Sequence, residues 1–317
     1  MMRCLEERSF PVSQLIPLAS SRSAGSFVDF CGEKIQVREA TPEAFEGVDI
    51  VLGAAGDAQA KELLPEAVRC GCVCVDNSHA FRLDEDVPLV IPEINAQDIK
   101  NHHGIIANPN CATIIGLVPL WPLHKAAGVK RLIVSTYQAA SGAGLAGLKE
   151  LEREMACLVS GESVGKTTPF AYQLAANLIP QIGGFNEEGY TSEEMKMQNE
   201  GRKIMHLPEL RVNCTCVRVP VMRSHSESIT AEFDHPITPD EARAVLEDAP
   251  GIRVVDDPSA LAYPMPLDTS DQDLVYVGRI RKDLSASATN SLTFFCCGDQ
   301  IRKGAATNAV QIAEYLV

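Results

Sequence analysis

One cysteine stands where a polar turn meets an apolar run. Residues 108–113 read Asn-Pro-Asn-Cys-Ala-Thr, and the apolar residues 114–123 are expected to form a helix. Cys111 would then lie at the N-terminus of that helix, where unpaired N–H groups and the positive end of the helix dipole stabilise a thiolate. The segment therefore indicates a nucleophile, although a small buried cysteine that follows a turn would have the same pattern.

An arginine and a histidine bracket the end of a predicted strand. Residues 216–225 read Cys-Val-Arg-Val-Pro-Val-Met-Arg-Ser-His, and Pro220 limits strand pairing there. The Arg218 guanidinium could grip a carboxylate through two parallel hydrogen bonds, and His225 could take up and return a proton. Taken alone, the segment is equally compatible with a surface ion pair at Arg218 and an ordinary strand residue at His225.

Two further segments could contribute to a site. Glu193 and Lys196 are three residues apart on a predicted helix, so they share a face and could present paired charges to a ligand, although such pairs are common on solvated helices. Residues 137–144 run from a strand into a turn of small residues, which permits the close approach of a ligand or of another strand.

The elements that must position these residues change in character near residue 129. Before it, short strands alternate with helices, which is typical of a doubly wound parallel sheet, and after it longer alternating strands indicate a mixed sheet with one covered face. The predicted strands span residues 15–19, 35–39, 48–53, 72–76, 89–91, 105–107, 130–137, 211–221, 225–233, 274–281 and 287–297. The other predicted helices span residues 1–9, 57–69, 192–205, 239–246 and 301–316.

This change divides the chain into two expected domains. Residues 1–111 are expected to form a Rossmann-like α/β domain that the C-terminal segment 298–317 completes. Residues 112–297 are expected to form an α+β domain with a mixed sheet. A length of 317 residues is sufficient for both cores.

Composition excludes several classes of partner. A net charge of −14 argues against nucleic acid and anionic membranes, and no apolar run approaches the ~18 residues that span a bilayer. The eleven cysteines have neither disulfide-framework nor zinc spacing. Cys70, Cys72 and Cys74 alternate along a strand-like run and should share one face. We interpret the cysteines as reduced core residues of a cytoplasmic protein without a metal site.

Together these segments resemble the aspartate-β-semialdehyde dehydrogenases from residues 5–11 to residues 308–314. The resemblance implies that Cys111 is the nucleophile, that His225 is the acid/base and that Gln138 orients the substrate. It further implies that Arg218 binds the substrate carboxylate. The remaining positions that it implies are Glu193 and Lys196 for substrate and phosphate, Arg82 for phosphate, Asn110 beside the nucleophile, and Ser141, Gly142 and Asn308 for the cofactor.

The resemblance also implies a reaction. A thioacyl intermediate on the cysteine carries the NADP-dependent reduction of L-aspartyl-4-phosphate to L-aspartate-4-semialdehyde with release of phosphate, towards lysine (through diaminopimelate), threonine and methionine. It implies a catalytic and dimerisation role for residues 112–297, and a homodimer. The alternatives are a related N-acetylglutamyl-phosphate reductase and an impaired homologue that acts as an oligomer partner. The Glu193/Lys196 helix and the spacing from Arg218 to His225 favour the aspartyl enzyme.

The sequence departs from the family at its start. The family opens with a strand and a Gly-x-x-Gly-x-x-Gly turn that cradles the cofactor pyrophosphate, whereas this sequence begins within the helix that should follow. Gly25, Gly53 and Gly56 do not lie on a first strand-to-helix turn. We therefore expect the chain as it stands to aggregate, or to bind NADPH weakly and to have little reductase activity.

A second part of the cofactor site is present. Residues 20–25 read Ser-Ser-Arg-Ser-Ala-Gly and follow a predicted strand, at the level where NAD enzymes tend to place an acid for the ribose. Arg22 and Ser23 would instead suit a 2′-phosphate, although a polar loop would have the same composition. The segment predicts NADP.

Overall fold

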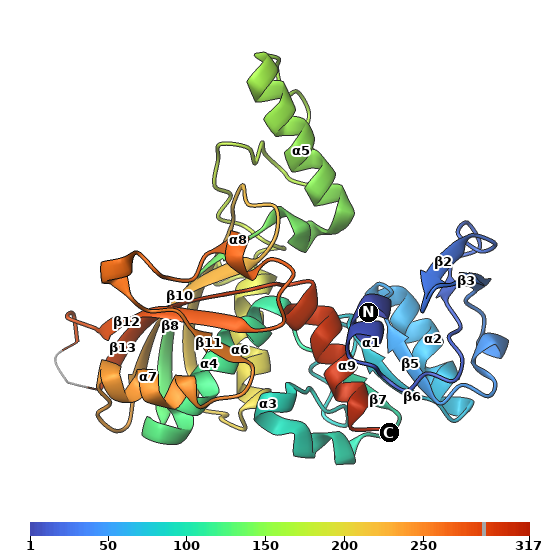
Figure 1. Cartoon of the computed structure of the whole chain (residues 1–317), viewed down its shortest axis with the longest axis horizontal. Coiled ribbons are helices and arrows are strands. Elements are labelled where there is room, and N and C mark those ends of the chain that lie inside the picture. Colours follow the sequence, from blue (N-terminus) through green and yellow to red (C-terminus); the bar gives the residue numbers. More distant parts are fainter. Residues whose placement is uncertain (287–289) are drawn as a thin grey trace. The chain divides into compact units, whose positions relative to one another are not determined.

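The structure is a computed structural model that describes residues 1–286 and 290–317, so the first three residues of the predicted strand 287–297 lie outside the described residues. The chain forms two compact units (Figure 1). The first comprises Met1–Pro109 and Ala305–Val317, and the second comprises Asn110–Gly304.

The first unit is built on a parallel sheet with the strand order β5-β6-β7. Its strands are β5 (Ile50–Gly53), β6 (Val73–Asp76) and β7 (Ile105–Ala107). Helix α2 (Asp57–Arg69) connects β5 to β6 and packs on the face that carries Cys74, whereas α9 (Thr307–Glu314) packs on the face that carries Val75. Successive strand residues point to opposite faces, so the sheet has helices on both sides.

Smaller elements complete the first unit. Strand β1 (Leu18–Ala19) pairs in parallel with β4 (Arg38–Glu39) in a separate two-stranded sheet. The others are α1 (Met2–Glu7), the hairpin β2 (Phe27–Phe30) and β3 (Glu33–Gln36), η1 (Pro42–Phe45), α3 (Pro92–Asn95) and η2 (Ala96–Asn101). Helix α1 packs against α9, and Arg8 forms an ion pair with Glu314 at 2.7 Å.

The second unit is built on a six-stranded mixed sheet with the order β11-β12-β13-β10-β8-β9. The strands are β8 (Val129–Gln138), β9 (Arg211–Arg218), β10 (His225–Phe233), β11 (Ile252–Val254), β12 (Val275–Lys282) and β13 (Ser291–Gly298). The pairs of β10 with β8 and with β13 are antiparallel, whereas β9 runs parallel to β8. The register places Gln138 opposite Arg218, at the end of the sheet where β10 begins with His225.

Helix α4 (Cys111–Ala127) is the buried helix of this unit. It is apolar all round, and its residues from Ala112 to Leu120 are all buried, as expected for a helix with no solvated face. The other helices are η3 (Ala140–Ala143), α5 (Gly144–Ser160), α6 (Ser192–Ile204), α7 (Pro239–Glu247), η4 (Pro258–Ala260), α8 (Pro266–Thr269) and η5 (Arg302–Ala306), a π-helical turn at the boundary between the units. Figure 1 shows α5 standing away from the six-stranded sheet.

Several local expectations were wrong. The expected strand 89–91 reduces to one bridge between Leu89 and Ala107, and neither α5 nor the β2–β3 hairpin was predicted. Cys70 ends α2 and is exposed, whereas Cys72 and Cys74 are buried, because a turn at Gly71 (φ +93°) separates Cys70 from β6. None of the described helices is both long and apolar enough to cross a membrane.

Candidate active site

The nucleophile candidate Cys111 is the first residue of α4, and Asn110 is the N-cap of that helix. The Asn110 Oδ1 atom accepts hydrogen bonds from the backbone N–H groups of Ala112 (3.0 Å) and Thr113 (3.2 Å). An N-cap side chain satisfies donors that a helix cannot satisfy internally, and it therefore fixes where the helix begins. Cys111 begins the helix, as the sequence predicted, and is partly exposed there.

Glu193 on α6 connects three of the predicted site residues. Its Oε1 atom accepts from Asn110 Nδ2 (3.0 Å) and from Gln138 Nε2 (3.1 Å), and its Oε2 atom accepts from Lys196 Nζ (2.8 Å). Burial alone would raise the pKa of the Glu193 carboxyl, but the Lys196 charge and the three hydrogen bonds together lower this pKa to about 2. Glu193 is thus a buried carboxylate that holds together Asn110 at the start of α4, the end of β8 and an ammonium group.

The backbone of Ala139 holds the arginine and the histidine through two successive peptide groups. Its carbonyl accepts a hydrogen bond from Arg218 Nη1 at 2.6 Å, and its N–H donates to His225 Nδ1 at 3.1 Å. Burial lowers the pKa of the Arg218 guanidinium, and charge interactions with Cys111 and Glu193 oppose this shift. The thiol and the Glu193 carboxylate therefore lie within electrostatic range of the guanidinium.

His225 is neutral and has a defined tautomer. Burial and, to a lesser extent, the Arg218 charge lower the pKa of its imidazole to about 3, while Glu193 acts in the opposite direction. Since a backbone N–H can only donate, Nδ1 must be the unprotonated nitrogen, and the neutral ring therefore carries its proton on Nε2. That Nε2 atom is buried and has no hydrogen-bond partner among the described residues. It is the one polar atom of the imidazole that remains available to a substrate.

The small-residue turn after β8 lies against both side chains. A Cβ atom on Gly142 would come within 2.5 Å of Arg218 Nη1 and 3.3 Å of His225 Nε2, so the turn passes closer than any other residue would allow. Its neighbour Ser141 is buried and hydrogen-bonded by the amide of Gln300, whose Oε1 atom accepts the N–H of Ser224 (2.8 Å). One glutamine therefore connects this turn to the residue that precedes His225.

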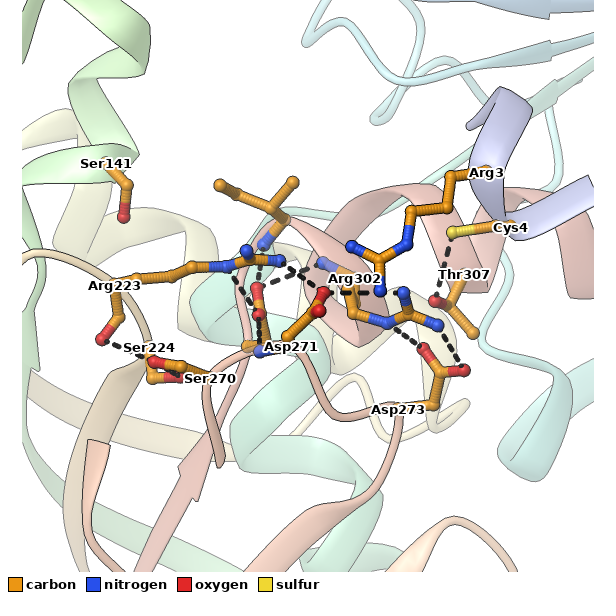
Figure 2. Close-up of polar contacts among 12 residues, drawn as sticks. Arg3, Cys4, Ser141, Arg223, Ser224, Ser270, Asp271, Asp273, Arg302 and Thr307 are labelled. Atoms are coloured by element: carbon orange, nitrogen blue, oxygen red, sulfur yellow. Dashed lines mark hydrogen bonds and ion pairs between the residues drawn. The ribbon is translucent and has the colours of Figure 1, made fainter. Parts of the chain in front are cut away.

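An ionic cluster anchors the segment before His225. Figure 2 shows Arg223 facing Asp271, with the pair Arg302 and Asp273 beside them. The Nε atom of Arg223 also lies 2.6 Å from a carboxylate oxygen of the fully buried Asp299. Ser224 has a φ of +75°, an unusual backbone conformation for serine that these contacts on both sides maintain.

A second close approach involves Cys111 itself. A Cβ atom on Gly304 in the π-helical turn would lie 2.9 Å from the Cys111 Cβ atom and 3.4 Å from Gln300 Cβ. Only glycine lets the chain pass Cys111 at this distance. Single π-turns often occur at functional sites.

The strand residues next to the site are also polar. Thr136 Oγ1 donates to Gln138 Oε1 at 3.2 Å, which orients the amide that binds Glu193. The next residue across the sheet is Glu227, opposite both Thr136 and Cys296. Burial, followed by the effects of Cys216 and Glu193, raises the pKa of the Glu227 carboxyl well above its usual value, so this group is neutral.

The remaining predicted residues lie in the first unit. Arg22 and Ser23 are exposed in the loop after β1. Arg82 is 7% exposed and donates to the backbone carbonyls of Asn108 and Asn77, each at 2.9 Å. The buried Asn308 side chain donates to Asn108 Oδ1 at 2.7 Å. Arg82 and Asn308 therefore meet at the carboxyl end of β7, the edge where open α/β sheets bind ligands.

The structure also reveals residues that the sequence did not indicate. Glu200 accepts the backbone N–H of Asn110, Thr136 orients Gln138, and Gln300 and Asp299 hold the two turns around His225. Glu200 follows Glu193 by seven residues, a spacing that places both on one helix face. Among the described residues, no group of His, Cys, Asp or Glu could hold a metal ion.

Comparison with protein families gives matches in both halves of the chain. Residues 1–102 match the family described as semialdehyde dehydrogenase, NAD binding domain, and residues 120–303 match semialdehyde dehydrogenase, dimerisation domain. The aspartate-semialdehyde dehydrogenase of Bacillus subtilis (strain 168) is 47% identical over 323 residues, which cover 100% of this chain and 93% of that protein. The enzyme of Aquifex aeolicus (strain VF5) is 48% identical over 319 residues, with 100% and 93% covered.

Solved structures agree with these relatives. Aspartate semialdehyde dehydrogenase II of Vibrio cholerae, complexed with ASA, has a TM-score of 0.96 and 42% identity, and the match covers 99% of this chain and 93% of that chain. The Candida albicans enzyme with NADP has a TM-score of 0.75 and 25% identity, with 99% and 94% covered. The expected fold class, a Rossmann-like domain with a mixed-sheet domain, is confirmed. With identity at this level over its whole length, the chain belongs to the aspartate-semialdehyde dehydrogenase family.

Proposed function

We propose that the residues gathered in the second unit carry out the family reaction, the NADP-dependent reduction of L-aspartyl-4-phosphate to L-aspartate-4-semialdehyde. This reaction belongs to the biosynthesis of lysine, threonine and methionine. The observation that carries the proposal is the backbone of Ala139, whose carbonyl and N–H hold a guanidinium and an imidazole together while Cys111 interacts electrostatically with that guanidinium. The full-length relatives favour this activity over an N-acetylglutamyl-phosphate reductase.

Cys111 is the nucleophile in this proposal. Its thiolate attacks the acyl carbon, the C–S bond forms, and phosphate leaves with the electron pair of the C–O bond. NADPH, when bound, supplies the hydride that reduces the resulting thioester. The C–S bond then breaks, the sulfur leaves as thiolate, and the aldehyde is released. The helix N-terminus at Asn110 favours the thiolate at the start and at the end of the cycle.

His225 acts through Nε2–H. A neutral imidazole that donates a hydrogen bond stabilises negative charge on the substrate carbonyl oxygen without adding a charge of its own. The Ala139 N–H holds the ring in this tautomer, because rotation or proton exchange would lose the bond to Nδ1. The acid/base role expected from the sequence is thereby narrowed: His225 donates a hydrogen bond through Nε2–H and keeps its proton, because loss of that proton would leave an imidazolate.

Arg218 and the Glu193–Lys196 pair bind the substrate. The Nη1 atom of Arg218 donates to the Ala139 carbonyl, and the other N–H groups of the guanidinium can donate two parallel hydrogen bonds to a carboxylate. Lys196 is partly exposed beside Glu193 and provides a cation for the phosphate. Gln138, which is held by Glu193 and by Thr136, orients the acyl group.

NADP is the cofactor. In the first unit, exposed Arg22 and its neighbouring hydroxyl Ser23 suit the 2′-phosphate, and Arg22 forms no ion pair with the described residues. The Asn308 and Arg82 contacts at Asn108 lie at the sheet edge that favours nucleotides and phosphate. We assign cofactor binding to residues 1–111 with 298–317, and catalysis and dimerisation to residues 112–297.

The expected setting is a homodimer that acts on small molecules. The match of residues 120–303 to a dimerisation domain supports self-association. We propose a cytoplasmic location because all eleven cysteines are free. The net charge of −14 disfavours nucleic acid and anionic membrane as partners.

The test is turnover of aspartate semialdehyde with NADP and phosphate, followed by the absorbance of NADPH. The chain is compared with its Cys111→Ala variant. We expect turnover that Cys111→Ala abolishes. Activity that survives Cys111→Ala, or a preference for the N-acetylglutamate semialdehyde, would overturn the proposal.

A further inference from the structure

Glu200 is a buried carboxylate next to the nucleophile that none of the roles above uses. It lies on α6, seven residues after Glu193, and is 1% exposed. Its Oε2 atom accepts the backbone N–H of Asn110 at 2.7 Å. Asn110 immediately precedes Cys111, so this hydrogen bond acts one residue away from the reacting sulfur.

Glu200 completes a set of contacts that leaves Asn110 no freedom. Glu193 accepts the side-chain Nδ2, the first turn of α4 donates to Oδ1, and Glu200 accepts the main-chain N–H. The side-chain contacts alone would still permit rotation of the peptide that joins Pro109 to Asn110. The bond to Glu200 fixes that peptide plane, and with it the direction from which the chain enters α4.

Helix α6 is itself held firmly, which makes Glu200 an effective anchor. Thr191 and Glu194 form a reciprocal capping box at its N-terminus, and Glu194 Oε1 also accepts the N–H of Cys216 at 3.0 Å. Cys216 lies on β9 two residues before Arg218. The strand that carries the arginine and the turn that carries the nucleophile are therefore tied to one helix.

We propose that Glu200 is a positioning residue that sets the place of Cys111 relative to the substrate groups, through its hydrogen bond to the Asn110 N–H. The proposal rests on the proposed function for the identity of the nucleophile. Its role depends on an acceptor at this position rather than on a negative charge, since a second carboxylate beside the helix N-terminus opposes the thiolate.

The experiment compares Glu200→Ala with Glu200→Gln. Both variants are neutral, so the difference between them reports the hydrogen bond and not the charge. The glutamine oxygen can still accept the Asn110 N–H, whereas alanine leaves a buried donor without a partner. We expect kcat of E200A to be ~10–100-fold below wild type, since small displacements of a reacting group cost this much, and kcat of E200Q to stay within about threefold.

A second readout needs no substrate. The pH dependence of Cys111 alkylation by iodoacetamide is measured by mass spectrometry for each variant. We expect the midpoint of E200A to lie above that of E200Q, because only E200Q keeps Cys111 at the capped helix end. A chain without reductase activity that shows this difference would refute the proposed function and leave the role of Glu200 intact.

Asn199→Ala, on the neighbouring position of α6, is the control and should match wild type in both measurements. If E200A does not fold, Glu200→Asp replaces it: this variant keeps the charge but shortens the reach, so it should be more impaired than E200Q. The proposal is wrong if E200A and E200Q have equal kcat and equal alkylation midpoints, or if E200D outperforms E200Q. A loss of thermal stability with unchanged kcat per folded molecule would likewise reduce Glu200 to a packing residue.

Discussion

The buried neutral state of His225 predicts a specific acid sensitivity. Its pKa is lowered to about 3 from the usual 6.5, so between these values the unfolded chain binds a proton that the folded chain does not. The free energy of unfolding must then fall as the pH drops below 6.5. Between pH ~7.5 and pH ~4.5 the two pKa values give a loss of about 3 kcal/mol from this one residue.

The substitution His225→Asn isolates that contribution. The asparagine oxygen can accept the Ala139 N–H in place of Nδ1, but it does not titrate. Unfolding free energies from urea titrations are measured for wild type and variant at both pH values. We expect the variant to be less stable near pH ~7.5 and to gain about 3 kcal/mol relative to wild type near pH ~4.5, because every other titration cancels in the difference.

His235→Asn provides the matched control, since His235 is exposed in the same unit. A His225→Asn difference that changes by less than about 1 kcal/mol over the same range would refute the reasoning. It would mean that water or a charged partner reaches the imidazole, and the Nε2–H donor role would lose its basis.

Three further outcomes are expected. Arg218→Lys keeps the charge but loses the two-point grip on a carboxylate, so KM for aspartate semialdehyde should rise ~10-fold or more with a smaller change in kcat. His225→Ala should instead lower kcat by ~10²–10⁴. The opposite pattern in steady-state kinetics would mean that the two roles must be exchanged. Gly142→Ala places a Cβ atom 2.5 Å from Arg218 Nη1, so it should break the hydrogen bond from Arg218 to the Ala139 carbonyl and lower kcat/KM by ~10-fold or more. Unchanged kinetics would show that the turn at residue 142 can move aside to accommodate the methyl group. Arg22→Ala should raise the Kd for NADPH ~10-fold in a fluorescence titration and leave that for NADH unchanged; equal losses for both would exclude a 2′-phosphate contact.

The sequence predicted a strand or helix well where one buried face gave the apolar residues a clear periodicity. The strand expected at residues 225–233 is the observed β10, because alternate side chains face the buried α4. Helix α5 was missed because it begins directly after small residues that were interpreted as a turn. The bridge at Leu89 has a strand-like composition, but it pairs with only one residue of β7.

The site, too, could be predicted from the sequence only in part. The resemblance to the family, now confirmed, supplied the types and roles expected of Cys111, Arg218 and His225. It could not indicate which atoms of these residues are occupied, because that depends on a backbone peptide and on residues far away in the sequence. Glu200 has the spacing of an ordinary solvated helix residue, and only packing against the nucleophile turn distinguishes it.

The backbone of Ala139 has a consequence for how this enzyme can vary and how it can be studied. The histidine binds the N–H of the peptide before the Ala139 Cα atom and the arginine binds the carbonyl of the peptide after it, whereas the methyl group of residue 139 contributes no polar contact to either. Alanine-scanning mutagenesis cannot detect that the site depends on these backbone groups, since position 139 is already alanine. An ester replacement of the amide by chemical synthesis, or proline at this position, would remove the N–H and uncouple the histidine while leaving the carbonyl for the arginine. Selection at residue 139 thus acts on two backbone groups rather than on a side chain, and a tolerant side chain there would conceal an intolerant backbone.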